Sequence, residues 1–139
     1  MTSSPTLSQK LTAEVIGTAI LVFIGAGSVP LTVLLTGNQP FGSAQLSTIS
    51  FCFAFAIFAA VYSVGHISGC HINPAVTIAL AATKKVDWST AAAYIGAQLV
   101  GAMLGADPPR ADRQQPGDAR PGFRQLQPRH QRHAGRHRG

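Results

Sequence analysis

The chain has 139 residues, enough for one small domain, and its formal net charge of +6 is unevenly distributed. No Lys, Arg, Asp or Glu occurs from Val15 to Thr83, whereas residues 107–139 carry eight arginines. The basicity therefore belongs to a terminal segment and excludes a basic soluble domain. The long uncharged stretch is typical of a membrane protein.

Neither the cysteines nor the polar residues predict a catalytic or metal centre. Cys52 and Cys70 match neither zinc-finger spacing nor a disulfide framework. His66, Cys70 and His71 lie close in sequence but lack a fourth metal ligand. No nucleophile–base pair or carboxylate pair is present, so we expect no enzymatic activity and no cofactor.

The first apolar segment predicts a transmembrane helix over about residues 11–35, after a short mobile N-terminus at residues 1–9. Such a helix spans a hydrocarbon core of about 30 Å. Pro30 predicts a kink or an early end. Glu14 is the only acid in this region. It lies either at the interface, within reach of water, or inside the protein, accepting hydrogen bonds from irregular backbone.

A second spanning helix is predicted over about residues 46–65, after a loop rich in turn-forming residues. One face carries a run of aromatic rings, which we interpret as a lipid-facing or packing stripe: Phe51, Phe55, Phe58 and Tyr62. Phe53 lies about 200° around the helix from Phe51. It is the one aromatic residue of this helix that could face something else.

The segment from Gly65 to Thr77 predicts a helix that begins at membrane depth. Asn73 is a favoured N-cap, and Pro74 suits the first helical position. The helix that follows, over about residues 73–83, is about 16 Å long, roughly half a bilayer. Irregular backbone at that depth is tolerated only inside protein or beside a watery cavity. We therefore predict a re-entrant half-helix.

A third spanning helix is predicted over about residues 89–106, with Trp88 as an interface anchor. Ala97, Gly101 and Gly105 form a face of small residues suited to close helix packing. The predicted fold class is thus an all-α membrane protein with three transmembrane helices and one re-entrant half-helix over residues 10–106. A disordered basic tail would follow over residues 107–139.

The donors and acceptors of the re-entrant segment suggest what it binds. Successive backbone carbonyls could form a ladder of acceptors, and Asn73 could cap the half-helix while its amide nitrogen faces a solute. The positive end of the half-helix dipole disfavours cations and protons, whereas neutral polar molecules are little affected. The carbonyls are those of Gly69, Cys70, His71 and Ile72.

Residues 66–77 resemble the first Asn-Pro-Ala box of the aquaporins, the major intrinsic protein family. Residues 13–18 look like the first helix of that family, and residues 93–102 look like its third. The resemblance implies a pore lined by Asn73, Pro74 and Ala75 together with the carbonyl ladder.

The same resemblance assigns supporting and selecting roles outside the pore box. It implies that Glu14 and His66 support the re-entrant segment. It also implies that Phe53 belongs to the selectivity constriction. A Phe at that place is similar to the water-selective type, whereas glycerol channels often carry Trp.

The implied function is passive transport of water, or of glycerol or another small neutral solute, across the lipid bilayer. Tetramers would be expected from the resemblance, with no nucleic-acid partner. The family is an inverted repeat of two halves, and this chain contains one Asn-Pro-Ala box. Lys10, Lys84 and Lys85 place the N-terminus in the cytoplasm and the protein in the cell membrane.

Two other functions are open on the sequence. The chain could be a small three-helix membrane protein for interaction or structure, without transport, which the small-residue face supports. The arginine-rich tail could bind nucleic acid or anionic lipid, although it lacks interleaved aromatic residues.

The composition changes abruptly at Asp107, and eight arginines carried to the outer side would contradict the positive-inside rule. We interpret residues 107–139 as the product of a reading-frame shift or a sequencing error near codon 106. Resequencing of the locus is expected to reveal a second Asn-Pro-Ala box, followed by Arg, in another frame downstream. If resequencing of the locus gives the same intact reading frame and the same tail, the hypothesis is overturned.

Overall fold

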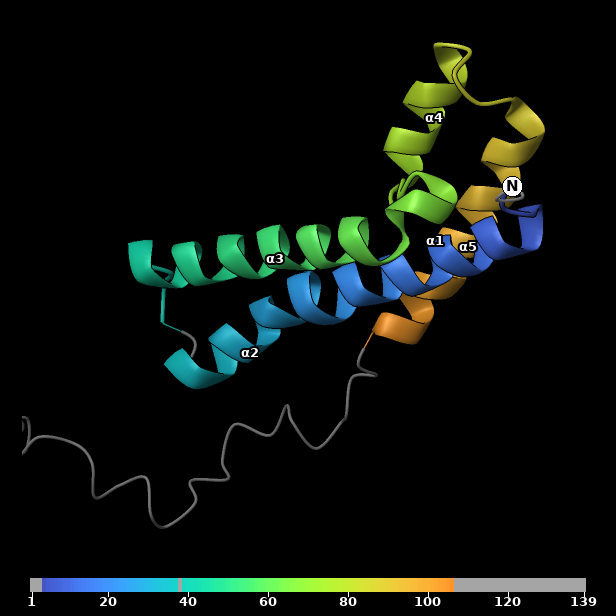
Figure 1. The fold of residues 1–139 in the computed structure, drawn as a ribbon. Coiled ribbons are helices and arrows are strands. Elements are labelled where there is room, and N and C mark those ends of the chain that lie inside the picture. Colours follow the sequence, from blue (N-terminus) through green and yellow to red (C-terminus); the bar gives the residue numbers. More distant parts are fainter. Residues whose placement is uncertain (1–3, 38, 107–139) are drawn as a thin grey trace, which may run out of the picture. The chain divides into compact units, whose positions relative to one another are not determined.

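The computed structural model describes residues 4–37 and 39–106, and within these ranges every regular element is a helix (Figure 1). The predicted all-α class is thereby confirmed. One continuous helix of 30 residues comprises α1 (Leu7–Ile20), the π-helical segment η1 (Leu21–Ala26) and α2 (Gly27–Thr36). The others are α3 (Ser43–Ser68), α4 (Pro74–Ala82) and α5 (Trp88–Gly105). The predicted tail lies outside the described residues.

The first helix begins at Leu7, within the segment that the sequence predicted to be a mobile N-terminus. Thr6 and Gln9 form a capping box. The Gln9 N–H donates to the Thr6 hydroxyl at 3.3 Å, and the Thr6 N–H donates to the Gln9 side chain at 2.8 Å. These bonds satisfy donors that the first turn leaves unpaired. The prediction was wrong there because the cap is polar and hydropathy does not register it.

Pro30 does not end the first helix, which continues to Thr36 and stops at Gly37 in the left-handed conformation, with φ of 63°. The irregularity instead precedes the proline. In η1 the Gly27 N–H bonds to the Val22 carbonyl, five residues back. Because proline has no N–H and its ring crowds the preceding turn, a widened turn relieves the crowding without breaking the helix.

The start of α5 is fixed by Asp87. Its carboxylate accepts hydrogen bonds from the Ser89 hydroxyl and from both the N–H and the hydroxyl of Thr90. These bonds hold the pKa of the Asp87 carboxyl below its usual range. A charged carboxylate therefore sits at the positive end of the helix dipole, beside the exposed Trp88.

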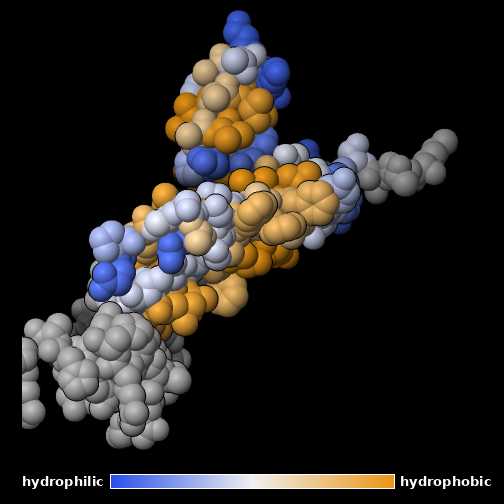
Figure 2. All heavy atoms as spheres, turned by 90° about the vertical axis from the view of Figure 1, so that its left-hand side faces the viewer, coloured by the Kyte–Doolittle hydropathy of each residue, from blue (hydrophilic) through white to orange (hydrophobic). Residues whose placement is uncertain are grey.

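The long helices turn most of their apolar residues outward. Residues 7–36 and 43–68 are long and apolar enough to cross a membrane, yet only 22% and 17% of their most apolar windows are buried. A core helix of a soluble protein would be mostly buried. The aromatic stripe of α3 is exposed along its length. In Figure 2, hydrophobic residues also cover much of the upper lobe, formed by α4 and the start of α5, with hydrophilic residues at its free end.

The helix α1 packs against both α3 and α5, and α4 contacts α5 (Figure 1). The contact between α1 and α5 is close because two glycines meet main-chain atoms. A Cβ on Gly101 would collide with the Val15 carbonyl oxygen, and one on Gly105 would lie 2.5 Å from the Ala19 carbonyl oxygen. The small-residue face predicted for α5 is therefore an internal helix–helix contact.

We expect Gly101→Ala to lower the free energy of unfolding by about 1–3 kcal/mol, because the methyl group meets backbone that side-chain rotation does not clear. Denaturation in mixed detergent micelles measures the loss. Gly96→Ala on the same helix is the matched control, because no atom of another described segment lies within 4 Å of the added carbon. Equal destabilisation by both variants would contradict the packing role.

Candidate pore-lining segment

The chain leaves α3 at Ser68 and turns back into α4 through strained backbone. Gly69, Cys70 and Ile72 have φ values of 88°, 51° and 42°. Glycine adopts such angles without penalty, but Cys does so rarely and a β-branched Ile hardly at all. Conformations of this kind persist only where the surroundings hold them in place.

The carboxylate of Glu14 holds this turn. Glu14 is fully buried and accepts four hydrogen bonds. One oxygen accepts from the Ser68 hydroxyl at 2.7 Å and from the His71 N–H at 2.9 Å. The other accepts from the Ile72 N–H at 2.7 Å and from the Gln98 side-chain amide at 2.8 Å. Of the two sequence-based alternatives, Glu14 thus takes the inward position, bonded to irregular backbone.

Gln98 joins three helices and was missed by the sequence analysis. Its Nε2 donates to Glu14 on α1 and, at 2.9 Å, to the Thr77 hydroxyl on α4. The amide orientation follows from these partners, because a carboxylate supplies acceptors only. The Gln98 Oε1 atom is buried without a hydrogen-bond partner among the described residues. A glutamine in a spanning segment was itself the available signal, since such polar residues face the protein interior.

Tyr94, one turn before Gln98, braces the turn from the same helix. Its hydroxyl donates to the Ser68 carbonyl at 3.0 Å, and its ring lies edge-on to the His71 ring with centroids 5.0 Å apart. The His71 Nδ1 atom lies 3.2 Å from the Thr77 hydroxyl. His71 is therefore buried inside the network, whereas Cys70 is half-buried and its N–H bonds to the Ser68 hydroxyl at 3.1 Å.

Asn73 caps α4 and keeps its amide nitrogen unengaged. Its backbone is extended, and its Oδ1 accepts from the Ala75 N–H at 2.8 Å, with Pro74 in the first helical turn. The residue is exposed, and no hydrogen bond from its Nδ2 reaches the part of the chain that the structure describes. Likewise, no donor within residues 4–37 and 39–106 reaches the carbonyl oxygens of residues 69–72.

His66 and Phe53 lie outside the polar network. His66 is exposed on the last turn of α3 and makes no hydrogen bond through its ring to any described residue. The support that the resemblance assigned to it is supplied in this structure by His71 and Gln98. Phe53 is 36% exposed, and its ring covers Gly25 of η1.

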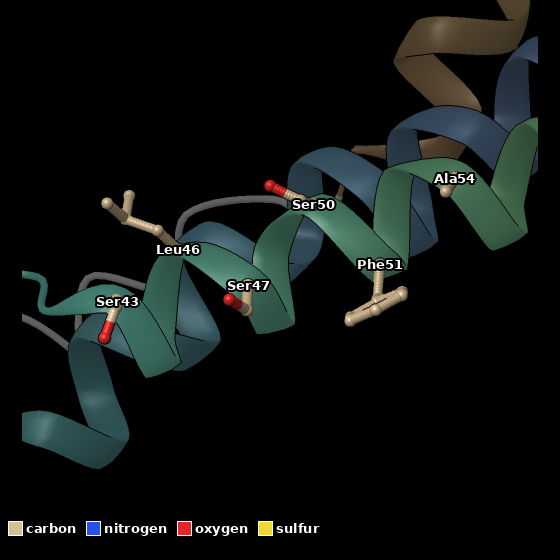
Figure 3. A pocket seen from close by; sticks show the side chains of 6 residues that line it. All are labelled: Ser43, Leu46, Ser47, Ser50, Phe51 and Ala54. Atoms are coloured by element: carbon tan, nitrogen blue, oxygen red, sulfur yellow. The ribbon is translucent and has the colours of Figure 1, made fainter.

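A shallow hollow on the outer surface of α3 belongs to neither group (Figure 3). All of its lining residues come from the first half of that one helix, at the far end from Gly69: Ser43, Leu46, Ser47, Ser50, Phe51 and Ala54. It is open to the surroundings and includes no residue of the re-entrant turn, so we do not assign the site there.

The long helices expose apolar residues, and the half-helix α4 begins at a turn that buried hydrogen bonds hold in place. These features define a polytopic membrane protein with a re-entrant segment. The sequence model for "Major intrinsic protein" matches residues 1–110. The chain therefore belongs to the major intrinsic protein family.

Curated relatives with similar sequences are named as aquaporins. The chain is 45% identical over 112 residues to "Aquaporin AqpM" of Methanothermobacter marburgensis, a match that covers 72% of this chain and 46% of the relative. It is 42% identical over 105 residues to "Probable aquaporin NIP4-2" of Arabidopsis thaliana, covering 73% of this chain and 35% of the relative. The chain thus spans less than half the length of these relatives.

Replacing Glu14 with Gln should destabilise the turn, because an amide nitrogen would then face N–H and hydroxyl donors. We expect the free energy of unfolding to fall by about 1–3 kcal/mol for each buried donor that is left unpaired. Faster hydrogen exchange at the His71 and Ile72 amides would localise the effect.

Thr18→Val is the matched control for this substitution, one helical turn away. The Thr18 hydroxyl is buried and has no hydrogen-bond partner in the described ranges. Its removal should leave both amides protected. If Glu14→Gln leaves exchange unchanged, the carboxylate does not hold the turn.

Proposed function

We propose that the chain forms one half of a channel for the passive permeation of water or of a small neutral solute such as glycerol. The observation that carries this proposal is the unengaged hydrogen-bonding capacity at Asn73. A side-chain amide nitrogen and four consecutive backbone carbonyls have no hydrogen-bond partner among the described residues, and they lie beside a half-helix N-terminus. Backbone groups at membrane depth need partners, and a line of water molecules supplies them.

This arrangement suits neutral solutes. The carbonyls of residues 69–72 accept hydrogen bonds in succession, and the Asn73 amide donates where the ladder ends. The half-helix N-terminus carries about half a positive charge, which raises the energy of a cation or proton beside it. Pro74 and Ala75 present no competing charge. The chemistry is therefore permeation, with no bond made or broken.

Phe53 is proposed to limit solute size at a constriction. Its side chain is one-third exposed on α3 and carries no polar atom, so it would narrow a passage without binding the solute. By narrowing the passage, the aromatic ring would favour water over the larger glycerol molecule.

A complete passage needs a second wall, because Asn73 lies exposed on the described half. We propose that this wall is a second half of the same architecture, and that full channels associate as homo-oligomers, with the tetramer as the state implied by the family. We also propose that the N-terminus lies on the cytoplasmic side of the cell membrane, because Lys10, Lys84 and Lys85 would then follow the positive-inside rule.

The alternative is a three-helix membrane protein without transport. Its main support was the small-residue face on α5, but Gly101 and Gly105 already pack against α1 within the chain. The exposed apolar surface of α4 remains the observation in its favour, with Val76 44% and Ile78 46% exposed.

The two functions are distinguished by stopped-flow light scattering of proteoliposomes that contain the full chain together with the second half of an aquaporin as a separate polypeptide. We expect water flux above that of vesicles containing the second half alone, and no proton conductance. Asn73→Ser should reduce the flux several-fold while keeping α4 intact, because Ser is an equally good N-cap but lacks the amide nitrogen. Flux no higher than with the second half alone would overturn the channel and favour the alternative.

A further inference from the structure

The π-helical segment η1 places a glycine directly beneath the ring of Phe53. A Cβ built on Gly25 would lie 2.7 Å from Cδ1, 3.0 Å from Cε1 and 3.2 Å from Cγ of that ring. All three of the nearest atoms belong to Phe53, and the first distance is shorter than real Cβ contacts allow. The ring therefore rests on main-chain atoms of η1, in a place that a residue with a side chain would occupy itself.

Hydrogen bonds within the helix hold the Gly25 carbonyl. In a π-helical turn that carbonyl would pair with the N–H five residues on, but residue 30 is proline and has none. It accepts instead from the Gly27 N–H and from the Ser28 hydroxyl, which donates at 2.6 Å. These bonds stabilise the widened turn locally, next to the ring of Phe53.

One side of the Phe53 ring lies against η1, and the residue is 36% exposed. We expect an atom added at Gly25 to displace the ring away from η1, toward its exposed side. In the proposed channel that side borders the passage.

We propose that Gly25 is a positioning residue for Phe53. The space above Gly25 that the ring occupies, which we call the glycine seat, sets how far the ring reaches into the passage. The glycine seat therefore sets the size of the largest neutral solute that can pass. The inference rests on the proposed function, but it assigns the control of solute size to a main-chain position outside the Asn-Pro-Ala box. With glycine at position 25 the ring lies back against η1, whereas a side chain at that position would push the ring outward and narrow the passage.

The first test follows the ring itself and needs no transport. Full-length chain carrying para-fluorophenylalanine at position 53, in lipid nanodiscs, reports the ring environment by ¹⁹F NMR. Gly25→Ala is expected to shift the resonance and to increase its broadening by a soluble paramagnetic reagent. Gly96→Ala adds the same methyl group at a position where no other segment of the described chain lies within 4 Å, and should change neither the resonance nor its broadening. An unmoved resonance in Gly25→Ala, or an equal shift in Gly96→Ala, overturns the seat.

The second test measures permeation in proteoliposomes. Gly25→Ala is expected to lower glycerol flux several-fold more than water flux. Combination with Phe53→Leu should abolish that difference, because the flat ring that the methyl group displaces is gone. A glycerol-to-water ratio that falls equally in both backgrounds would show that Gly25 acts only on the helix, and would overturn the proposal.

The two tests separate this inference from the proposed function. A moved resonance with an unchanged flux ratio overturns the control of solute size by Gly25. If the unmodified chain conducts no water even when it is reconstituted with the second half, the proposed function fails, and the ¹⁹F resonance still decides whether Gly25 seats the ring.

Discussion

The Glu14 carboxylate is the interaction on which the rest of the structure depends. A carboxylate removed from water is strongly unfavourable unless its oxygens are fully hydrogen-bonded. Here the donors come from the end of α3, from two backbone amides of the turn and from α5. The same bonds satisfy amides that lipid would leave unpaired. One side chain thus stabilises both its own burial and a turn whose backbone is strained at Cys70 and Ile72.

The network directs unsatisfied groups outward as a result. Glu14 takes the N–H groups of His71 and Ile72, and the Gly65 carbonyl and Ser68 hydroxyl take those of Gly69 and Cys70, so the N–H groups of residues 69–72 are not available to the carbonyls of the turn. Thr77 bonds the Asn73 carbonyl at 3.1 Å, which anchors the first turn of α4 and leaves the Asn73 side chain exposed. The buried network engages the N–H groups of the turn and leaves its carbonyls and the Asn73 side-chain amide without partners among the described residues. These remaining groups are the ones that a solute would contact along the proposed permeation path.

Close helix contact makes this network possible. Gly101 and Gly105 let α5 approach the backbone of α1, which brings Gln98 within reach of Glu14. Further along the first helix, in η1, the Phe53 ring packs against bare backbone at Gly25. In both places a missing side chain sets the distance between elements, and a neighbouring polar or aromatic group uses the space.

The sequence by itself determined the long apolar helices and the helix start at Asn73-Pro74, because hydropathy and capping act between neighbouring residues. It also placed an acid and an Asn-Pro-Ala box in one chain. Local patterns were insufficient at the N-terminus, where the Thr6 cap extended the helix, and at Pro30, where the helix widened instead of ending. Only the tertiary structure showed that Glu14 bonds to Gln98, 84 residues away, and that Gly101 and Gly105 of α5 pack against α1 within the chain. The physical reason is that helical periodicity fixes which residues share a face, but the rotation of one helix against another is set by packing and buried hydrogen bonds between distant segments.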